Sequence, residues 1–140
     1  MHDMTRRTDD TALDFGALRH AIEHCDPDAM LGFYAEEARL SIINADAPRS
    51  SPFELRGKGE IAKHLRATFG QEATHRVERE AAVGEDRVTF REACDYPDGG
   101  RVVVETTLEV RDEKIVRQVD VVASDAGAYS QEGSGRGPPT

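Results

Sequence analysis

The stretch RVVVETTLEVRDEKIVRQVDVV, residues 101–122, decides the fold. In its first half, alternate residues from Val102 to Val110 are valine, threonine or leucine, and most charged residues fall between them. Side chains of a β-strand alternate between the two faces of a sheet, so the pattern predicts a strand with one apolar face. A turn at residues 111–113 and a second strand over residues 114–122 complete a predicted hairpin.

Composition limits the kinds of partner that the chain can have. Its 140 residues predict one domain, and 38% hydrophobic residues allow one modest core. A net charge of −9 leaves no basic stripe for nucleic-acid phosphates and disfavours anionic membrane surfaces. No apolar run approaches the roughly 20 residues of a membrane span, and none follows Arg6 and Arg7 as in a secretory signal. Cys25 and Cys94 are predicted on distant elements, so we expect no disulfide and a cytoplasmic protein.

Polar ends enclose the predicted domain, which covers residues 11–123. Residues 1–10 are polar and residues 124–140 are rich in Gly, Ser and Pro, so both segments are predicted to be disordered. Helical patterns cover residues 12–24, 28–35 and 60–69, and strand patterns cover 38–45, 74–83 and 87–96 before the hairpin. This order predicts an α+β domain: about three helices on a strongly curved antiparallel or mixed sheet, leaving a cone with an apolar pocket.

Local signals mark the ends of the helices and one loop. Thr11 with Asp14 is typical of a capping box, and Asp26-Pro27 is typical of a second helix start. Residues 46–56 contain two prolines and one large apolar residue, Phe53, and are predicted to be a loop. Phe53 either folds over a cavity as a lid or patches the core.

Four short motifs carry a resemblance to a known family. They are HCDPDAM at 24–30, FYAEEA at 33–38, RGKGEI at 56–61 and VRDEKIV at 110–116. Together they resemble the NTF2-like superfamily and, within it, the SnoaL-like polyketide cyclases. Glu113 stands where the hairpin turn of that family usually has glycine. The resemblance covers about residues 12–122 and implies the cone-shaped α+β fold.

The resemblance implies two classes of function. The first is an enzyme that uses cofactor-free acid–base chemistry to cyclise, isomerise or dehydrate an apolar, carbonyl-containing, polyketide-like metabolite. The second is a non-catalytic ligand-binding or dimerisation module, because this fold hosts both. Such sheets commonly form homodimers, and Val103, Val119 and Val121 beside charges suit a contact of that kind.

Two related chemistries are not expected. Ketosteroid isomerases use a tyrosine and two aspartates, and those positions align with Leu18, Ile42 and Thr106 here. Limonene-epoxide-hydrolase relatives use an Arg-x-Asp pair on a strand, where this chain has Arg91 and Ala93.

His64 lies within the apolar face of the helix predicted over residues 60–69, which also carries Ile61, Leu65 and Phe69. The resemblance places this position in the pocket lining. His64 is therefore a candidate for catalysis or ligand contact, and the alternative is a core histidine whose hydrogen bonds are satisfied.

Glu92 shares the predicted inner face of strand 87–96 with Val88, Phe90 and Cys94. Burial would raise the pKa of its carboxyl, as a general acid or base requires. The alternative is a register error or a bulge that turns Glu92 to solvent.

Asp120 lies on either face of the sheet, depending on the hairpin register. A strict two-residue turn at Asp112-Glu113 turns Asp120 outward, and one further residue turns Gln118 and Asp120 inward. In SnoaL-like cyclases a last-strand aspartate is the catalytic base, so the resemblance favours the inward register.

The predicted catalytic set is Asp120, or Glu92 in its place, with His64 and Tyr34 as hydrogen-bond donors. Tyr34 is predicted to close the second helix, where packing alone also explains it. The residues predicted to contact a bound molecule are Phe15, Leu18, Phe53, Phe69, His75, Phe90, Cys94, Thr106 and Gln118.

No metal site is predicted. His20 and His24 are four residues apart on a helix, a spacing that could hold a metal, but no third ligand is evident. Cys94 has no histidine near it in the sequence, so it is interpreted as a small buried hydrophobic residue.

Overall fold

A six-stranded sheet forms the body of the computed structural model, which describes residues 13–46 and 51–124. Its strands lie in the order β2-β1-β6-β5-β4-β3, and all neighbours are antiparallel except the parallel pair β1 and β6. The strands are β1 (Tyr34–Asn44), β2 (Phe53–Arg56), β3 (Thr74–Val83), β4 (Arg87–Asp95), β5 (Arg101–Arg111) and β6 (Lys114–Ser124). The predicted α+β class with a mixed sheet is confirmed.

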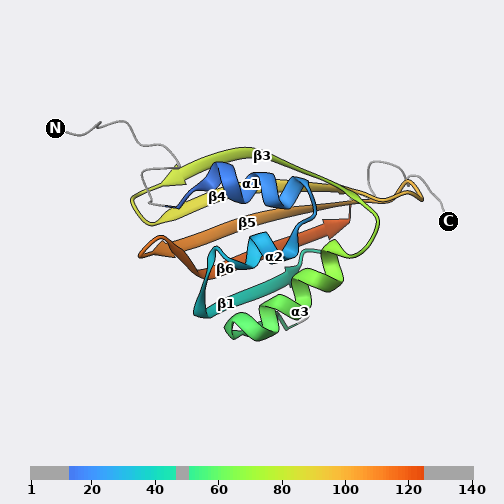
Figure 1. Cartoon of the computed structure of the whole chain (residues 1–140). Helices are drawn as coiled ribbons and strands as arrows, with labels where there is room; N and C mark the ends of the chain where they lie inside the picture. The colour runs from blue at the N-terminus through green and yellow to red at the C-terminus, as the bar shows by residue number, and fades with distance from the viewer. Residues whose placement is uncertain (1–12, 47–50, 125–140) are drawn as a thin grey trace.

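Three helices cover one face of this sheet (Figure 1). They are α1 (Phe15–Glu23), α2 (Pro27–Leu31) and α3 (Gly57–Phe69). Helix α1 packs on β3, α3 packs on β1 and β2, and α2 contacts both other helices. No described helix is long and apolar enough to cross a membrane. The disorder predicted for residues 1–10 and 125–140 falls outside the described residues, whereas Ser124 ends β6.

The core lies between the helices and the inner face of the sheet, as the sequence periodicity predicts. Phe15, Leu18 and Ile22 of the predicted α1 stripe are buried, and Phe15 packs against Phe90 of β4 with ring centroids 5.3 Å apart. On β5 the predicted inner residues Thr106, Leu108 and Val110 are buried.

The second helix is shorter than the sequence predicts, and Tyr34 is not part of it. Helix α2 ends at Leu31. Strand β1 begins at Tyr34, four residues before the predicted start at residue 38, and ends at Asn44. Tyr34 pairs with β6 in parallel, and the regular pairing resumes at Arg39 after an irregularity, so sheet pairing rather than helix propensity decides the conformation of Tyr34. Tyr34 pairs with Ile115 and is buried.

Two further local predictions need correction. Asp14 is itself the N-cap of α1 and accepts a hydrogen bond from the Ala17 backbone N–H, whereas Thr11 lies outside the described residues. The predicted loop over residues 46–56 contains the edge strand β2, in which Leu55 is buried against Leu40 of β1. Phe53 lies at the start of this edge strand with 59% of its surface exposed, so it neither covers the cavity as a lid nor patches the core.

A bulge in β6 decides the face of Asp120. The turn at Asp112-Glu113 has only two residues, because Arg111 pairs with Lys114 and Val110 pairs with Ile115. Glu109 then pairs with Arg117, so β6 holds one extra residue, Val116. After this bulge Gln118 and Asp120 share the inner face. The structure therefore combines the short turn of one predicted alternative with the inward register of the other.

A second bulge, in β3, decides the face of His75. Glu78 pairs with Arg91, but Ala81 pairs with Thr89, so β3 gains one residue near Arg79, whose φ is +59°. His75 is consequently opposite Cys94 and faces inward. A regular ladder from the same turn would place Arg76 there instead.

Replacing Glu113 by glycine is expected to stabilise the protein by about 1 kcal/mol. Glu113 has φ +67°, a left-handed conformation that costs a side chain energy and glycine almost none. Chemical denaturation measures the free energy of unfolding. As the matched control, Arg111→Gly in the adjacent extended strand should destabilise. A loss of stability in Glu113→Gly would contradict this account of the turn.

Candidate active site

A cavity of about 350 Å³ lies between the inner face of the sheet and the helices. This volume falls within the range typical of small-molecule sites. Aliphatic and aromatic side chains make most of its wall, which includes Leu18, Ile22, Met30, Leu40, Ile42, Leu65, Phe69, Phe90, Val102, Val104, Leu108 and Val122. The polar or titratable lining residues are Tyr34, His64, Thr68, Glu92, Cys94, Tyr96, Gln118 and Asp120.

Asp120 is held in this wall by two donors on one oxygen. Its Oδ1 accepts hydrogen bonds from Thr106 Oγ1 and Gln118 Nε2, both at 2.9 Å. Thr106 is the direct cross-strand partner of Asp120, and Gln118 precedes it by two residues on the same face. Among the described residues, no group donates to the second oxygen, Oδ2, which leaves it available to a molecule in the cavity.

Burial raises the pKa of the Asp120 carboxyl from 3.8 to about 6. The hydrogen bonds from Gln118 and Thr106 lower this pKa and offset part of the burial, while the negative charge of Glu92 raises it further. A carboxyl with a pKa near 6 is mostly ionised at neutral pH and is a stronger base than an exposed aspartate. These are the properties that a general base requires.

Tyr34 supports this group through Gln118. Its hydroxyl donates to Gln118 Oε1 at 2.5 Å, so the amide is fixed with its Nε2 toward Asp120. Burial, Asp120 and Glu92 raise the pKa of the Tyr34 hydroxyl, which therefore stays neutral. The hydroxyl proton of Tyr34 is already donated to Gln118, so Tyr34 positions the Gln118 amide. This role differs from the predicted one, in which Tyr34 donates to a molecule in the cavity.

His64 is the polar lining residue of α3. Its side chain is half-buried and makes no hydrogen bond to another described residue. Burial lowers the pKa of its imidazole, which favours the neutral ring. A neutral imidazole carries one N–H donor and one acceptor, and both are available to a molecule in the cavity.

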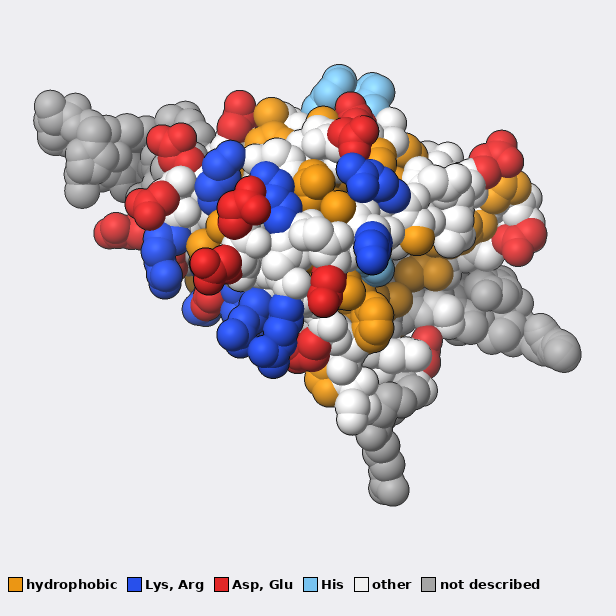
Figure 2. Space-filling view, turned by 60° about the horizontal axis from the view of Figure 1, so that its bottom comes forward, with side chains coloured by type: hydrophobic (Ala, Val, Ile, Leu, Met, Phe, Trp, Pro, Cys, Tyr) orange, Lys and Arg blue, Asp and Glu red, His pale blue; other side chains and the backbone are white. Residues whose placement is uncertain are grey.

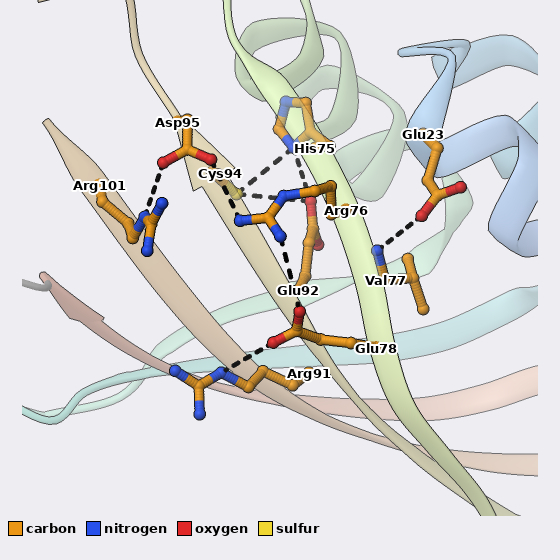
Figure 3. Close-up of polar contacts among 10 residues, drawn as sticks. All are labelled: Glu23, His75, Arg76, Val77, Glu78, Arg91, Glu92, Cys94, Asp95 and Arg101. Atoms are coloured by element: carbon orange, nitrogen blue, oxygen red, sulfur yellow. Dashed lines mark hydrogen bonds and ion pairs between the residues drawn. The ribbon is translucent and has the colours of Figure 1, made fainter. Parts of the chain in front are cut away.

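Glu92 faces the cavity, the first of the two alternatives for this residue, because β4 pairs with β5 without a bulge. Its Oε2 lies 2.7 Å from His75 Nδ1 and 3.5 Å from Cys94 Sγ, and Cys94 Sγ lies 3.3 Å from the same imidazole nitrogen (Figure 3). Burial and Glu92 raise the pKa of the Cys94 thiol. The three donor atoms lie within 4.8 Å of one another, close enough to hold a metal ion.

This cluster is not predicted from the sequence, because its members lie on two strands. His75 is 19 residues from Cys94 in the chain but directly opposite it in the sheet. The signal that could have revealed the pairing is a break in the alternation of inner and outer residues along β3. The odd-numbered residues His75 and Val77 face inward before the bulge, whereas the even-numbered Ala82 pairs with the buried Val88 after it.

The structure places the predicted contact residues in three groups. Leu18, Phe69, Phe90, Cys94 and Gln118 line the cavity. Phe15, His75 and Thr106 are buried behind its wall, and Phe53 is exposed on the edge strand.

Figure 2 shows acidic and basic side chains interspersed on the face turned forward, with hydrophobic side chains gathered at a recess.

His20 and His24, the pair at metal-binding spacing in the sequence, are exposed on α1 and stack with ring centroids 3.9 Å apart. No third ligand joins them within the described part of the chain.

Residues 16–118 match the SnoaL-like domain family. No protein of curated function is significantly similar in sequence to this chain. Among solved structures, an NTF2-like protein of unknown function from Mesorhizobium loti is similar with a TM-score of 0.69 and 24% identity, over 86% of this chain and 96% of that one.

Two similar structures have names that suggest an activity. A candidate ketosteroid isomerase from Kribbella flavida has a TM-score of 0.67 and 19% identity, over 86% of this chain and 82% of that one. A candidate polyketide cyclase from Xanthomonas campestris has a TM-score of 0.61 and 20% identity, over 89% of this chain and 96% of that one. At these identities the likeness shows the fold. Together with the match over most of the domain, it establishes that the chain belongs to the SnoaL-like domain family and has an NTF2-like fold.

Proposed function

We propose that this protein is an enzyme that moves a proton within an apolar, carbonyl-containing metabolite, by isomerase- or cyclase-type chemistry. Asp120 carries the proposal. It is a carboxyl with a pKa raised to about 6, it lies in the wall of an apolar cavity, and one of its oxygens faces no donor among the described residues. Such an environment costs stability, and groups shifted in this way are concentrated at functional sites.

The proposed step begins with the ionised carboxyl. Asp120 Oδ2 takes a proton from the carbon next to the carbonyl, so a C–H bond breaks and an O–H bond forms. The C–H electron pair becomes a new C=C bond, and the π pair of the carbonyl moves onto its oxygen to give an enolate. His64 donates its N–H to that oxygen, which stabilises the developing charge in an apolar environment. In an isomerisation, Asp120 then returns the proton to another atom of the substrate. In a cyclisation, the enolate carbon instead attacks a second carbonyl of the substrate, the π pair of that carbonyl moves onto its oxygen, and this oxygen takes the proton from Asp120.

The names of similar structures agree with this class of reaction. They include a candidate ketosteroid isomerase and a candidate polyketide cyclase. The family resemblance places Leu18, Ile42 and Thr106 at the positions of the catalytic residues of ketosteroid isomerases, so the proposed base of this chain comes from a different strand position. We also propose that the substrate resembles a polyketide.

A non-catalytic ligand-binding module is the second candidate function. One observation favours it: Tyr34 and Glu92 are already engaged by protein groups, which leaves fewer polar side chains free to act on a ligand. A binder and an enzyme need the same cavity, and only the enzyme needs the carboxylate of Asp120.

Wild-type protein is expected to bind bicyclic aryl ketones such as 1-tetralone and to accelerate exchange of their α-protons for deuterium. Titration calorimetry measures binding, and NMR in D₂O measures exchange. The rate should rise with pH through about 6 and then level, as the carboxyl of Asp120 ionises. Binding without accelerated exchange across a panel of such ketones would favour the binding module.

A variant with a filled cavity provides the matched control. Val104→Phe adds a ring to the cavity wall and leaves the network of Asp120 unchanged. We expect it to weaken ketone binding more than about tenfold, or about 1.4 kcal/mol. Val103→Phe, one residue earlier on the outer face of β5, should bind as wild type. Equal binding by all three proteins would contradict the cavity as the site.

A further inference from the structure

His75, Glu92 and Cys94 bring three different metal-binding atoms to one point. The separations are 2.7 Å between His75 Nδ1 and Glu92 Oε2, 3.3 Å between His75 Nδ1 and Cys94 Sγ, and 3.5 Å between Cys94 Sγ and Glu92 Oε2. Ligands at the usual zinc distances of about 2.0–2.3 Å lie roughly 3.3–3.7 Å apart at tetrahedral angles. Two of the three separations already fall in that range, and the third needs a small opening.

The arrangement does not suit a catalytic cysteine. A nucleophilic cysteine needs a histidine that contacts the thiol through one nitrogen and is oriented through the other. Here the thiol and the carboxylate both approach Nδ1, while Nε2 is buried with no hydrogen-bond partner among the described residues. The three groups therefore converge on one point between them, where a proton or a cation can lie.

The three side chains are held in place before any ligand arrives. His75 pairs directly with Cys94 across β3 and β4, and Glu92 precedes Cys94 by two residues on the same face (Figure 3). The His75 side chain is fully buried, and its ring packs on Phe69 with centroids 4.5 Å apart. Such fixed donors lose little freedom when they bind an ion.

We propose that His75, Glu92 and Cys94 form a binding site for a borderline-soft divalent metal, with Zn²⁺ the best match. A thiolate, an imidazole and a carboxylate together suit zinc better than magnesium or calcium, which prefer oxygen ligands only.

The fourth position faces the cavity. Glu92 and Cys94 line the cavity wall, and no further His, Cys, Asp or Glu among the described residues joins the three donors. Three protein ligands with one open position are typical of zinc that binds an outside molecule, whereas structural zinc has four protein ligands. The open position would take an oxygen of a molecule in the cavity. The site does not depend on the role of Asp120, because metal binding is measured without turnover.

The test is titration of chelator-treated protein with Zn²⁺ and, separately, Co²⁺. We expect one Zn²⁺ per chain, a rise in the melting temperature and, with Co²⁺, the intense near-ultraviolet band of a cobalt–thiolate bond. That band reports Cys94 directly. Cys94→Ser, His75→Gln and Glu92→Gln should each weaken binding by more than about 100-fold, because even outer partners of metal ligands contribute about 10- to 100-fold.

Three control variants make the result decisive. Cys25→Ser removes the other thiol, and His24→Gln removes half of the exposed histidine pair on α1. Both should keep wild-type binding and the cobalt–thiolate band. Asp120→Asn should also keep binding, so failure of the acid–base proposal is distinguishable from failure of this one. The proposal is overturned if wild-type protein binds no Zn²⁺ at micromolar concentration, or if binding is lost in Cys25→Ser or His24→Gln.

Discussion

Replacing Asp120 by asparagine is expected to raise the stability of the folded protein at pH 8 and, at the same time, to abolish its proposed activity. Asparagine keeps an oxygen that accepts from Thr106 and Gln118 but removes a charge that burial disfavours. A general base contributes about 10²- to 10⁴-fold to a rate, and we expect a loss of that size in ketone exchange. Stability and activity would thus change in opposite directions at one residue.

The sign of the stability effect is set by the raised pKa. The Asp120 carboxyl has a pKa of about 6 in the folded protein and an ordinary value near 3.8 in the unfolded chain. Between these values the folded state holds the proton more tightly than the unfolded chain does. The stabilising contribution of the protonated carboxyl is therefore complete below pH 3.8 and is lost as the pH rises through about 6. A shift of this size corresponds to about 3 kcal/mol at most. We expect Asp120→Asn to recover about 1–3 kcal/mol above pH 7.

Denaturant unfolding of both proteins at a series of pH values measures this effect. The advantage of Asp120→Asn should be full at pH 8 and should shrink as the pH falls from about 7 toward 4. Glu105→Gln removes an exposed carboxylate from the outer face of the neighbouring strand and should change stability by less than about 0.5 kcal/mol. A variant less stable than wild type at pH 8 would show that Asp120 is not disfavoured by burial.

The alternation of apolar and charged residues was sufficient to predict the sheet and its inner face. From Val102 to Val110 the pattern has a period of two with no break, and β5 pairs with β4 with no bulge, so each inner residue of β5 was assigned correctly. The stripe of α1 was equally regular. In such elements a local pattern determines the buried face, because a one-residue shift would expose the whole apolar set.

The site could not be predicted in the same way because two bulges determine it. Val116 in β6 and the segment at Arg79 in β3 each add one residue to their strand. Residues that lie beyond the bulge, as counted from the hairpin turn, therefore face the opposite side of the sheet from the one that a regular strand would give them. These bulges turn Asp120 and His75 inward. Nothing in their own residue types requires a bulge: pairing with the neighbouring strands does. The sequence alone therefore does not decide the face of Asp120, and it shows no histidine near Cys94.

Replacing Gln118 by leucine is expected to shift the pH profile of the proposed activity upward by about 1–2 units. Gln118 Nε2 donates to Asp120 Oδ1 at 2.9 Å and lowers the pKa of that carboxyl. A hydrogen bond to a charged group contributes about 1.5–3 kcal/mol, and one pKa unit corresponds to about 1.4 kcal/mol. Without this donor Asp120 stays protonated to higher pH, so the exchange rate at pH 7 falls while the rate at high pH approaches wild type.

A pH profile separates this positioning role from damage to the fold. Gln118→Leu also leaves the Tyr34 hydroxyl without its acceptor, which should destabilise the protein by about 1–3 kcal/mol. Adding Tyr34→Phe removes the unpaired hydroxyl, so the double variant should regain stability but keep the shifted profile. Thr106→Val removes the other donor to Asp120 and should shift the profile in the same direction by a smaller amount, because Gln118 has the larger effect on this pKa. A profile that stays centred near pH 6 in Gln118→Leu, with only a lower plateau, would mean that Asp120 is not the group whose ionisation controls the reaction.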